Sequence, residues 1–195
     1  RGVVVDGDPV PSAGGRPARQ HHLVANARNV LTLDLSGEYL RAGRVDLLGA
    51  LADQDETAAV ALGHDADARL VAYVTQRISE ERAAGNTISA LAVAVPGVID
   101  QHSGHVRLAP ALGWSDEPVA QKLREETGLP VLLENDVNAV ALGELLHGAA
   151  QGRRNVLYLS LGSGIGAALV IDGVLYRGAN GAAGNDLIKV GTPEA

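Results

Sequence analysis

The sequence contains no cysteine, no methionine and no phenylalanine, and tryptophan occurs once in its 195 residues. Without cysteine, these residues form no disulfide bond, carry no thiol nucleophile and offer no thiolate to a zinc ion. The apolar core must therefore be built from alanine, valine, leucine and isoleucine. The lack of methionine also means that Arg1 is not an initiator residue, so we expect the sequence to be part of a longer chain.

Long apolar runs are missing as well. No stretch of about 18 apolar residues is present, so the sequence predicts no membrane-spanning helix. The first residues do not show the charged and then apolar pattern of a secretory signal. Hydrophobic residues make up 46% of the chain, which suits one or two globular domains. We therefore expect a cytoplasmic protein that does not bind a membrane.

Charge is unevenly distributed along the chain. Residues 1–28 contain four arginines and two acidic residues, whereas residues 29–195 contain twelve basic and 21 acidic residues. The field of the acidic body does not favour nucleic acid, so any DNA contact must come from the N-terminal segment. There Arg16 and Arg19 stand in a Gly- and Pro-rich stretch, which is able to enter a narrow minor groove. Such a stretch is equally typical of a linker between domains.

The pattern of apolar residues predicts an α/β chain. Helices are expected where apolar residues recur at helical spacing, at residues 65–84, 115–127 and 137–147. A turn is expected at Asp6-Gly7. Three short strands in succession suggest an antiparallel meander, and residues 88–95 suggest a central strand. The expected strands and hairpins cover residues 2–5, 30–34, 40–45, 47–51, 88–95, 98–106, 131–133, 155–161, 167–171 and 174–176.

Two predictions concern individual side chains. In the helix at residues 65–84, a stripe at helical spacing is expected to face the core, and the polar residues near its end are expected to be solvated. Trp114 either lines a pocket or covers an apolar edge, and the second role is the more common one. The predicted stripe consists of Ala68, Val71, Ala72, Thr75, Ile78 and Ser79, and the solvated residues are Glu80, Glu81 and Arg82.

A polar corner lies at Glu134-Asn135-Asp136, directly after a buried strand and directly before a helix that ends at Gly148. Open α/β sheets hold ligands beyond the carboxyl ends of their strands. One carboxylate there, Asp136, is able to accept a proton from a substrate hydroxyl group. Because asparagine and aspartate are common helix caps, Asn135 or Asp136 could instead serve only to cap the helix.

Three further segments could face the same ligand. Asp34 ends a predicted strand, where it is either a metal-side or phosphate-side carboxylate or a turn residue. Pro96-Gly97 breaks another strand, and such a break either turns the chain or presents backbone amides. The glycine-rich residues 162–166 lie between two strands, so they are neither a dinucleotide fingerprint nor a Walker loop. Their amides and the Ser163 hydroxyl group can still cradle a phosphate.

Residues 91–184 closely resemble the ROK family (repressor, open reading frame, kinase). The matching segments, in order, are AVPGVID, GHVRLAPALGW, LPVLLENDVNAVALGE and LYLSLGSGIGAALVIDGVLYRGANGAAG. The resemblance implies an α/β, actin-like and ribonuclease-H-like sugar-kinase fold, with the first lobe nearly complete and the second lobe partial. Upstream, SAGGRPARQ followed by VLTLDLSGEYLRAGRVDLLG resembles the join between a winged helix-turn-helix domain and the sugar-binding domain in the repressor branch.

The resemblance implies three regions: a wing and linker at residues 1–20, the first lobe at 21–150, and the start of the second lobe at 151–195. It also implies a role for each matching residue. The catalytic base is Asp136, and the sugar contacts are Gly97, Asn135 and Asp136. The phosphate contacts are Asp34, Gly37, Gly162, Ser163 and Gly164, and the DNA contacts are Arg16 and Arg19.

The sequence departs from the kinase pattern at two places. Kinases of the family carry Asp-x-Gly-Gly-Thr-Lys, whereas residues 34–39 read DLSGEY, with a carboxylate where ATP phosphates would lie. Placing this carboxylate close to an ATP phosphate in a partly dry cleft brings two negative charges together, which costs on the order of several kcal/mol. After Ala183-Gly184 the family continues with a glutamate and a histidine that bind sugar, and that histidine also ligates zinc. Here Asn185 and Asp186 follow, and the cysteine zinc motif is absent.

We therefore expect a sugar-responsive repressor that binds a sugar or sugar phosphate between its lobes, changes its affinity for operator DNA, and forms a homodimer or higher homo-oligomer. Asp136 is then a sugar contact at a vestigial base position. The alternative is an ATP-dependent sugar kinase of the glucokinase or N-acetylmannosamine kinase type, and only that alternative requires ATP and magnesium. No structural zinc or other metal is expected in these residues. An inactive remnant is a third interpretation.

Overall fold

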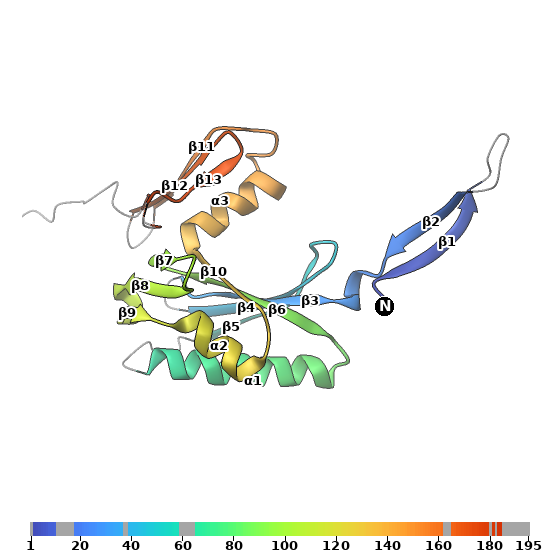
Figure 1. Cartoon of the computed structure of the whole chain (residues 1–195), viewed down its shortest axis with the longest axis horizontal. Coiled ribbons are helices and arrows are strands. Elements are labelled where there is room, and N and C mark those ends of the chain that lie inside the picture. Colours follow the sequence, from blue (N-terminus) through green and yellow to red (C-terminus); the bar gives the residue numbers. More distant parts are fainter. Residues whose placement is uncertain are drawn as a thin grey trace, which may run out of the picture.

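The computed structural model describes residues 2–10, 18–36, 39–58, 65–161, 165–179, 181 and 183–184. At its N-terminal end, β1 (Val4–Val10) and β2 (Ala18–Leu23) form an antiparallel hairpin that projects from the rest of the molecule (Figure 1). The predicted turn at Asp6-Gly7 is wrong, because both residues lie inside β1. A Cβ atom on Gly7 would collide with the ring of His22 across the hairpin, so the glycine permits close pairing of the strands.

A five-stranded sheet forms the centre of the first lobe, in the order β10-β6-β3-β4-β5. The first three strands in this order are parallel, and β4 and β5 continue antiparallel as the predicted meander. The middle strand is β3, so the prediction that residues 88–95 form the central strand is off by one position. The strands are β3 (Asn29–Asp34), β4 (Tyr39–Asp46), β5 (Leu51–Ala58), β6 (Ile88–Val95) and β10 (Val131–Asn135), and the short 3-10 helix η1 (Ala25–Ala27) leads into β3.

The third strand of the meander begins later than predicted. Leu47 and Leu48 form a turn, and β5 starts at Leu51. The cause is Asp46, whose Oδ1 accepts the backbone N–H groups of Leu48 at 2.8 Å and Ala50 at 2.9 Å. A carboxylate that satisfies two turn amides competes with the ladder hydrogen bonds of a strand.

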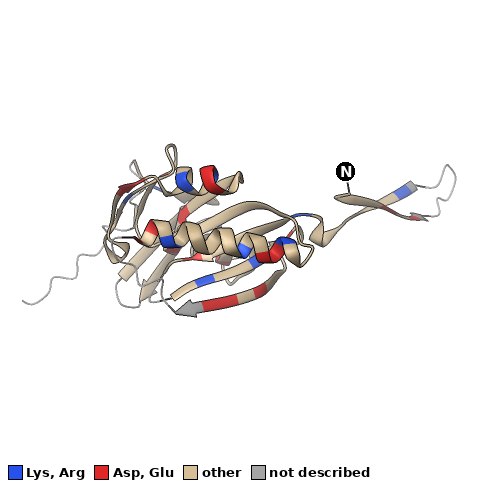
Figure 2. Cartoon of the chain, turned by 90° about the horizontal axis from the view of Figure 1, so that it is seen from below, with Lys and Arg blue, Asp and Glu red and all other residues tan. Residues whose placement is uncertain are grey.

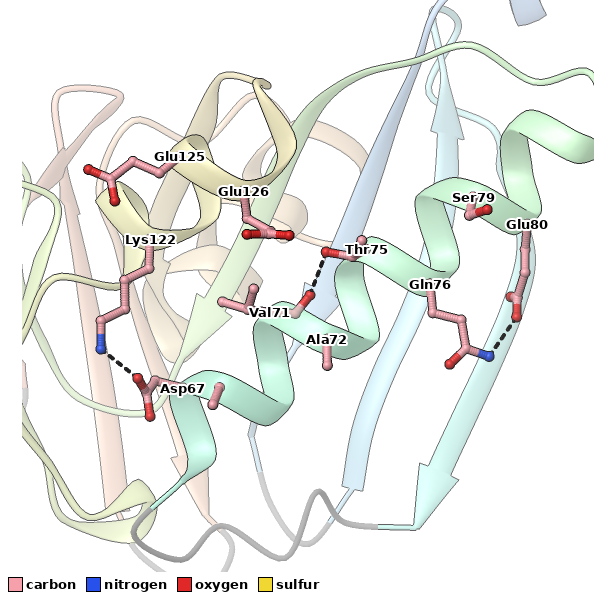
Figure 3. Close-up of a pocket in the computed structure, with 11 residues that line it drawn as sticks. Asp67, Val71, Ala72, Thr75, Gln76, Ser79, Glu80, Lys122, Glu125 and Glu126 are labelled. Carbon is pink, nitrogen blue, oxygen red and sulfur yellow. Dashed lines mark hydrogen bonds and ion pairs between the residues drawn. The ribbon is translucent and has the colours of Figure 1, made fainter.

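Helices α1 (Ala66–Ala83) and α2 (Val119–Thr127) lie along one face of this sheet (Figure 1). The buried face of α1 carries Leu70, Val74 and Ile78, which follow one another at intervals of one helical turn. The predicted stripe is wrong except for Ile78 and the half-buried Val71, because the larger side chains take the inner face. Its other members line a groove of about 810 Å³ between α1 and α2 (Figure 3): Ala68, Ala72, Thr75 and Ser79.

A small antiparallel sheet beside β10 contains β7 (Val98–Asp100), β8 (His105–Ala109) and β9 (Trp114–Glu117), with the 3-10 helix η2 (Pro110–Leu112) between β8 and β9. The predicted hairpin is confirmed, with Gly104 in the left-handed region (φ +73°). The predicted helix start at residue 115 is wrong, since residues 114–117 pair with β8 and α2 begins after Pro118. Trp114 is 5% exposed and packs in the main core.

Helix α3 (Asp136–His147) follows β10, and the chain continues with β11 (Val156–Leu161), β12 (Ile165–Ile171) and β13 (Val174–Tyr176), the strands of the predicted second lobe. The three strands form an antiparallel sheet, and Asp172 and Gly173 make its hairpin turn with φ values of +53° and +82°. This sheet and α3 share a small apolar core of their own: Val137, Ala141, Ala168, Val170 and Leu175. Packing therefore changes from the first core to the second at residue 136, whereas the lobe boundary at residue 150 stays a prediction.

Basic and acidic positions are interspersed along the ribbon of the described residues (Figure 2). The edge strand β5 carries three exposed acids, Asp53, Asp55 and Glu56. Charges on an edge strand oppose pairing with the strand of another molecule. Among the described helices, none is long and apolar enough to cross a membrane.

An ion-pair network joins α1 to the sheet. Glu81 was predicted to be solvated, but its side chain is 4% exposed and lies 3.2 Å from Arg44 Nε and 3.1 Å from Arg77 Nη2. Arg44, on β4, also donates to Asp53 at the edge strand. The reason for the wrong prediction is that two arginines from different elements converge on one helix position, which helical periodicity alone does not reveal.

Glu81 is therefore expected to stabilise the first lobe. The substitution Glu81→Leu should lower the free energy of unfolding by about 3 kcal/mol, because it leaves two largely buried guanidinium groups with one carboxylate fewer. Urea unfolding of the wild type and the variant measures this difference. The matched control Glu80→Gln, which changes a half-exposed neighbour on the same helix, should cost less than about 1 kcal/mol. Equal effects of the two substitutions on the free energy of unfolding would contradict a stabilising role for Glu81.

Candidate functional site

The polar corner is built where three parallel strands end at the same edge of the sheet. On the two sides of β6, Asp34 of β3 and Glu134 of β10 are both in register with Ala94. Asn135 is in register with Val95, the last residue of β6. The strand order therefore brings together the ends of segments that are far apart in the sequence, and the break at Pro96-Gly97 lies between them.

Asn135 connects two of these segments. Its side-chain Oδ1 accepts the backbone N–H of Asn138 at 3.0 Å, which caps α3. Its Nδ2 donates to the carbonyl oxygen of Gly97 at 3.1 Å. The capping interpretation is thus confirmed for Asn135, and the same side chain also ties the start of α3 to the break after β6. Asn135 is 4% exposed, so the amide is held in one orientation.

Gly97 permits this close arrangement. A Cβ atom at residue 97 would collide with the carbonyl oxygen of Leu108 and with Ala109 on β8. Any other residue would push the strand break away from β8 and change the position of the carbonyl group that Asn135 holds. The glycine is therefore required by packing, and a sugar contact at Gly97 stays a prediction.

Asp136 is the first residue of α3, and it is half-buried. Burial raises the pKa of its carboxyl group above the ordinary value, and the negative charge of Asp34 raises it further, although the N–H of Val137 donates to Oδ1 at 2.9 Å and opposes the shift. A carboxyl group with a raised pKa is a better proton acceptor than an ordinary aspartate. The chemistry of a base is thus present, while its use stays a prediction.

Asp34 makes a turn and also faces Asp136. Its Oδ1 accepts the backbone N–H of Ser36 at 2.8 Å, which confirms the turn interpretation. Its Oδ2 lies 3.6 Å from Nη1 of Arg41, a β4 residue that also pairs with Glu56 at 3.2 Å. A cation from the protein itself thus stands beside the carboxylate that was predicted to face phosphate or metal. Gly37, the other predicted residue of this loop, lies outside the described residues.

The second glycine loop can be located only by its flanking strands, because Gly162, Ser163 and Gly164 lie outside the described residues. Strands β11 and β12 pair from Leu161↔Ile165 onward, so the loop lies between two strands as predicted, but Ile165 and Gly166, which were predicted as part of it, belong to β12. A Cβ atom on Gly166 would collide with Val137 in the first turn of α3. The strand that leaves the loop therefore passes directly beside the neighbour of Asp136.

The predicted DNA contacts lie elsewhere. Arg19 is on the projecting hairpin (Figure 1), where its Nη1 donates to Asp6 at 3.0 Å and its side chain is exposed. Arg16 lies outside the described residues. DNA contact through either arginine stays a prediction.

Two residues of the corner were not given a role by the sequence. Glu134 was recognised as part of the polar triplet, and Arg177 was not singled out. Their side chains meet across the two lobes, with Arg177 Nε 3.1 Å and Nη2 2.5 Å from Glu134 Oε2. Strand propensity and spacing place Glu134 at a strand end, but no local pattern pairs it with a residue 43 positions away.

A mixed sheet with an aspartate at the end of β3, an Asn-Asp corner at the start of α3 and a following antiparallel sheet are the features of the actin-like sugar-kinase folds. The model of the ROK family matches residues 31–186, which is most of the chain. The chain therefore belongs to the ROK family.

Its relatives include both branches of that family. A xylose repressor from Caldicellulosiruptor bescii is 31% identical over 186 residues, which are 94% of this chain and 46% of the repressor. A glucokinase from Halalkalibacterium halodurans is 38% identical over 109 residues, which are 56% of this chain and 33% of that enzyme.

A solved structure has the same fold. The ROK family glucokinase from Streptomyces griseus, in complex with glucose and AMPPNP, matches with a TM-score of 0.70 and 31% identity over 80% of this chain and 48% of that one. The chain thus spans half or less of the length of these three proteins.

The raised pKa of Asp136 predicts how the corner affects stability. Since the pKa is higher in the folded than in the unfolded chain, the ionised carboxylate opposes folding at neutral pH, and this cost disappears below the unfolded value. We expect Asp136→Asn to raise Tm at pH 7, by about 2–4 °C for each kcal/mol recovered. The gain should vanish below about pH 4, the ordinary pKa of aspartate.

Thermal unfolding from pH 3 to pH 8 measures this difference. Asp116→Asn is the matched control of opposite sign, because His105 and Arg107 lower the pKa of exposed Asp116, and its ionised form therefore favours folding. A loss of stability in Asp136→Asn at pH 7 would contradict the prediction.

Proposed function

We propose that this chain is the sugar-binding part of a sugar-responsive transcriptional repressor of the ROK family. The observation that carries the proposal is the extent of the similarity. The alignment with the xylose repressor takes in 94% of the chain, so it must include β2 of the projecting hairpin, whereas the glucokinase alignment takes in 56%. The hairpin is the part that a repressor would add to a sugar-kinase fold as the wing of its DNA-binding domain.

The sugar would bind at the corner of the first lobe. Asn135 and Asp136 present amide and carboxylate groups at the end of β10, and the carbonyl group of Gly97 is held beside them. Such groups suit the hydroxyl groups of a pentose or hexose, because each hydroxyl donates one hydrogen bond and accepts others. The raised pKa of Asp136 makes its carboxylate a strong acceptor for a sugar hydroxyl, whether or not a proton is transferred.

Sugar binding would change DNA affinity by moving the lobes relative to one another. A ligand that prefers the closed arrangement shifts the whole protein towards it. A coupling free energy of roughly 1–3 kcal/mol between the sugar site and the DNA site is enough for a repressor switch. In a dimer, the shift would alter the spacing of two DNA-binding domains on the operator.

An ATP-dependent sugar kinase is the second candidate, and the Asp136 carboxyl group with its raised pKa favours it. The residues fit ATP and magnesium only in part. Asp34 is available as a carboxylate on the phosphate side, but Arg41 already stands beside it, and DLSGEY at residues 34–39 lacks the threonine and the second glycine of the kinase loop. We therefore derive no step that involves ATP.

The first test measures operator binding by the full-length protein. D-xylose, D-glucose and N-acetylmannosamine, each with its phosphate ester, are added while the fluorescence anisotropy of a labelled DNA fragment from upstream of its own gene is recorded. One of them should weaken DNA binding by about 5- to 150-fold, and Asn135→Ala should remove that response. A full panel without effect on DNA affinity would contradict the repressor proposal.

The second test measures sugar kinase activity. ADP release with the same sugars should be negligible in the wild type. Robust turnover that disappears in Asp136→Ala would favour the kinase and contradict a role limited to repression.

The third test concerns the N-terminal arginine. Replacing Arg16 by alanine should weaken operator binding, because one phosphate or groove contact is lost. The slope of log K against log salt concentration should become shallower by about one unit, since about one counterion fewer is released. The comparison is Arg28→Ala, an exposed arginine between the hairpin and β3. An unchanged salt slope in Arg16→Ala would assign the segment to a linker.

A further inference from the structure

Glu134 is a buried acid without a direct role in the proposed sugar contacts. It is 8% exposed, and three hydrogen-bond donors from two parts of the chain converge on one of its carboxylate oxygens. Oε1 accepts the backbone N–H of Asn135 at 3.0 Å, Nδ2 of Asn138 at 3.2 Å and Nε2 of Gln101 at 3.4 Å. One carboxylate thus holds the backbone of the corner, the first turn of α3 and the turn between β7 and β8.

The fourth partner comes from the second lobe. Arg177 follows β13, and both its Nε and Nη2 donate to Glu134 Oε2, at 3.1 Å and 2.5 Å. A guanidinium group that donates twice to one carboxylate fixes direction as well as distance. The Glu134 side chain is 10% exposed and the Arg177 side chain is 39% exposed, so the pair is screened by solvent from the arginine side only.

The segment that begins with Arg177 touches both lobes. A Cβ atom on Gly181 would collide with the carbonyl oxygen of Ile99 on β7, and one on Gly184 would collide with the carbonyl oxygen of Ala167 on β12. Both glycines are in the left-handed region, with φ values of +72° and +99°. The backbone is therefore packed closely between the small sheet of the first lobe and the sheet of the second lobe.

A cavity lies beside this segment. It has a volume of about 600 Å³ and lies between the β7–β8 hairpin and residues 177–179 and 181, with Gln101, Arg107 and Arg177 among its lining residues. Arg107 is already paired with Asp100 and Asp116 in the hairpin. Arg177 therefore lies in the cavity wall, where its side chain is paired with Glu134 and its carbonyl oxygen accepts the backbone N–H of Ala183 at 3.1 Å.

We propose that Glu134 and Arg177 are a positioning pair that connects the Asn135-Asp136 corner to the second lobe. The carboxylate that holds the N–H of Asn135 also holds Arg177, so a ligand that fixes the corner also fixes the segment that leads into the second lobe. The ligand in this account rests on the proposed function, whereas the connection between the lobes does not. An ion pair that only stabilises the fold would affect Tm without changing how the lobes are placed.

The first experiment measures lobe placement in the absence of any sugar. These 195 residues contain no cysteine. Once any cysteine in the rest of the full-length protein has been replaced by serine, spin labels at Glu126→Cys on α2 and Val174→Cys on β13 report the distance between the lobes. Double electron–electron resonance should give a broader or shifted distance distribution in Arg177→Gln. Arg177→Lys should recover most of the wild-type distribution. The control Arg154→Gln breaks an exposed ion pair within the second lobe and should change nothing.

The second experiment measures coupling. In Arg177→Gln and in Glu134→Gln, which keeps the shape and loses the charge, the sugar-induced change in DNA affinity should fall at least about fivefold. Tm is recorded for every variant, so that a fall shared with Arg154→Gln is assigned to stability.

The outcomes separate the two proposals. A distance distribution in Arg177→Gln that equals that of the wild type would overturn the positioning pair. A sugar-induced change in DNA affinity that falls only in proportion to the loss of Tm across the variants would overturn it too. A changed distribution in Arg177→Gln, together with a wild-type protein that ignores every sugar, supports the pair and overturns the sugar-sensing function.

Discussion

The side chain of Asn135 makes the hydrogen bonds on which the rest of the corner depends. Its oxygen caps α3, and its amide nitrogen holds the carbonyl group of Gly97. The first bond fixes where α3 begins, and the start of α3 in turn fixes Asp136. The second bond fixes the strand break against β10. Because the residue is buried between its partners, the geometry of the corner exists before any ligand arrives, which lowers the entropic cost of binding.

An intact corner does not by itself make a kinase. Proton transfer needs only the carboxyl group of Asp136, whereas phosphoryl transfer needs the phosphates placed in line with the sugar and their charge compensated. In this chain the neighbouring carboxylate, Asp34, has an arginine beside it, and the loop that follows lacks the threonine and the second glycine of the kinase pattern. Under the proposed function, the same corner would bind sugar hydroxyl groups and signal that it is occupied, without catalysis. Glu134 and Arg177 would then connect the occupied corner to the second lobe.

How far the sequence predicts the structure depends on the range of the interactions. The carboxyl ends of β3 and β6, the cap at Asn135 and the hairpin at Asp172-Gly173 follow from local patterns, so they were found. The inner face of α1 was misassigned because Leu70 and Val74 compete with a stripe of smaller residues at the same spacing. The Glu134–Arg177 pair was missed because it depends on how two lobes meet, which no local pattern records.

The most direct test of the account is calorimetric titration of the full-length protein with D-xylose and D-glucose in the absence of nucleotide. The account predicts that one of these sugars binds at a single site, and that Asn135→Ala, which releases both α3 and Gly97, abolishes the binding. Binding that survives in Asn135→Ala, or that requires ATP in the wild type, would contradict it.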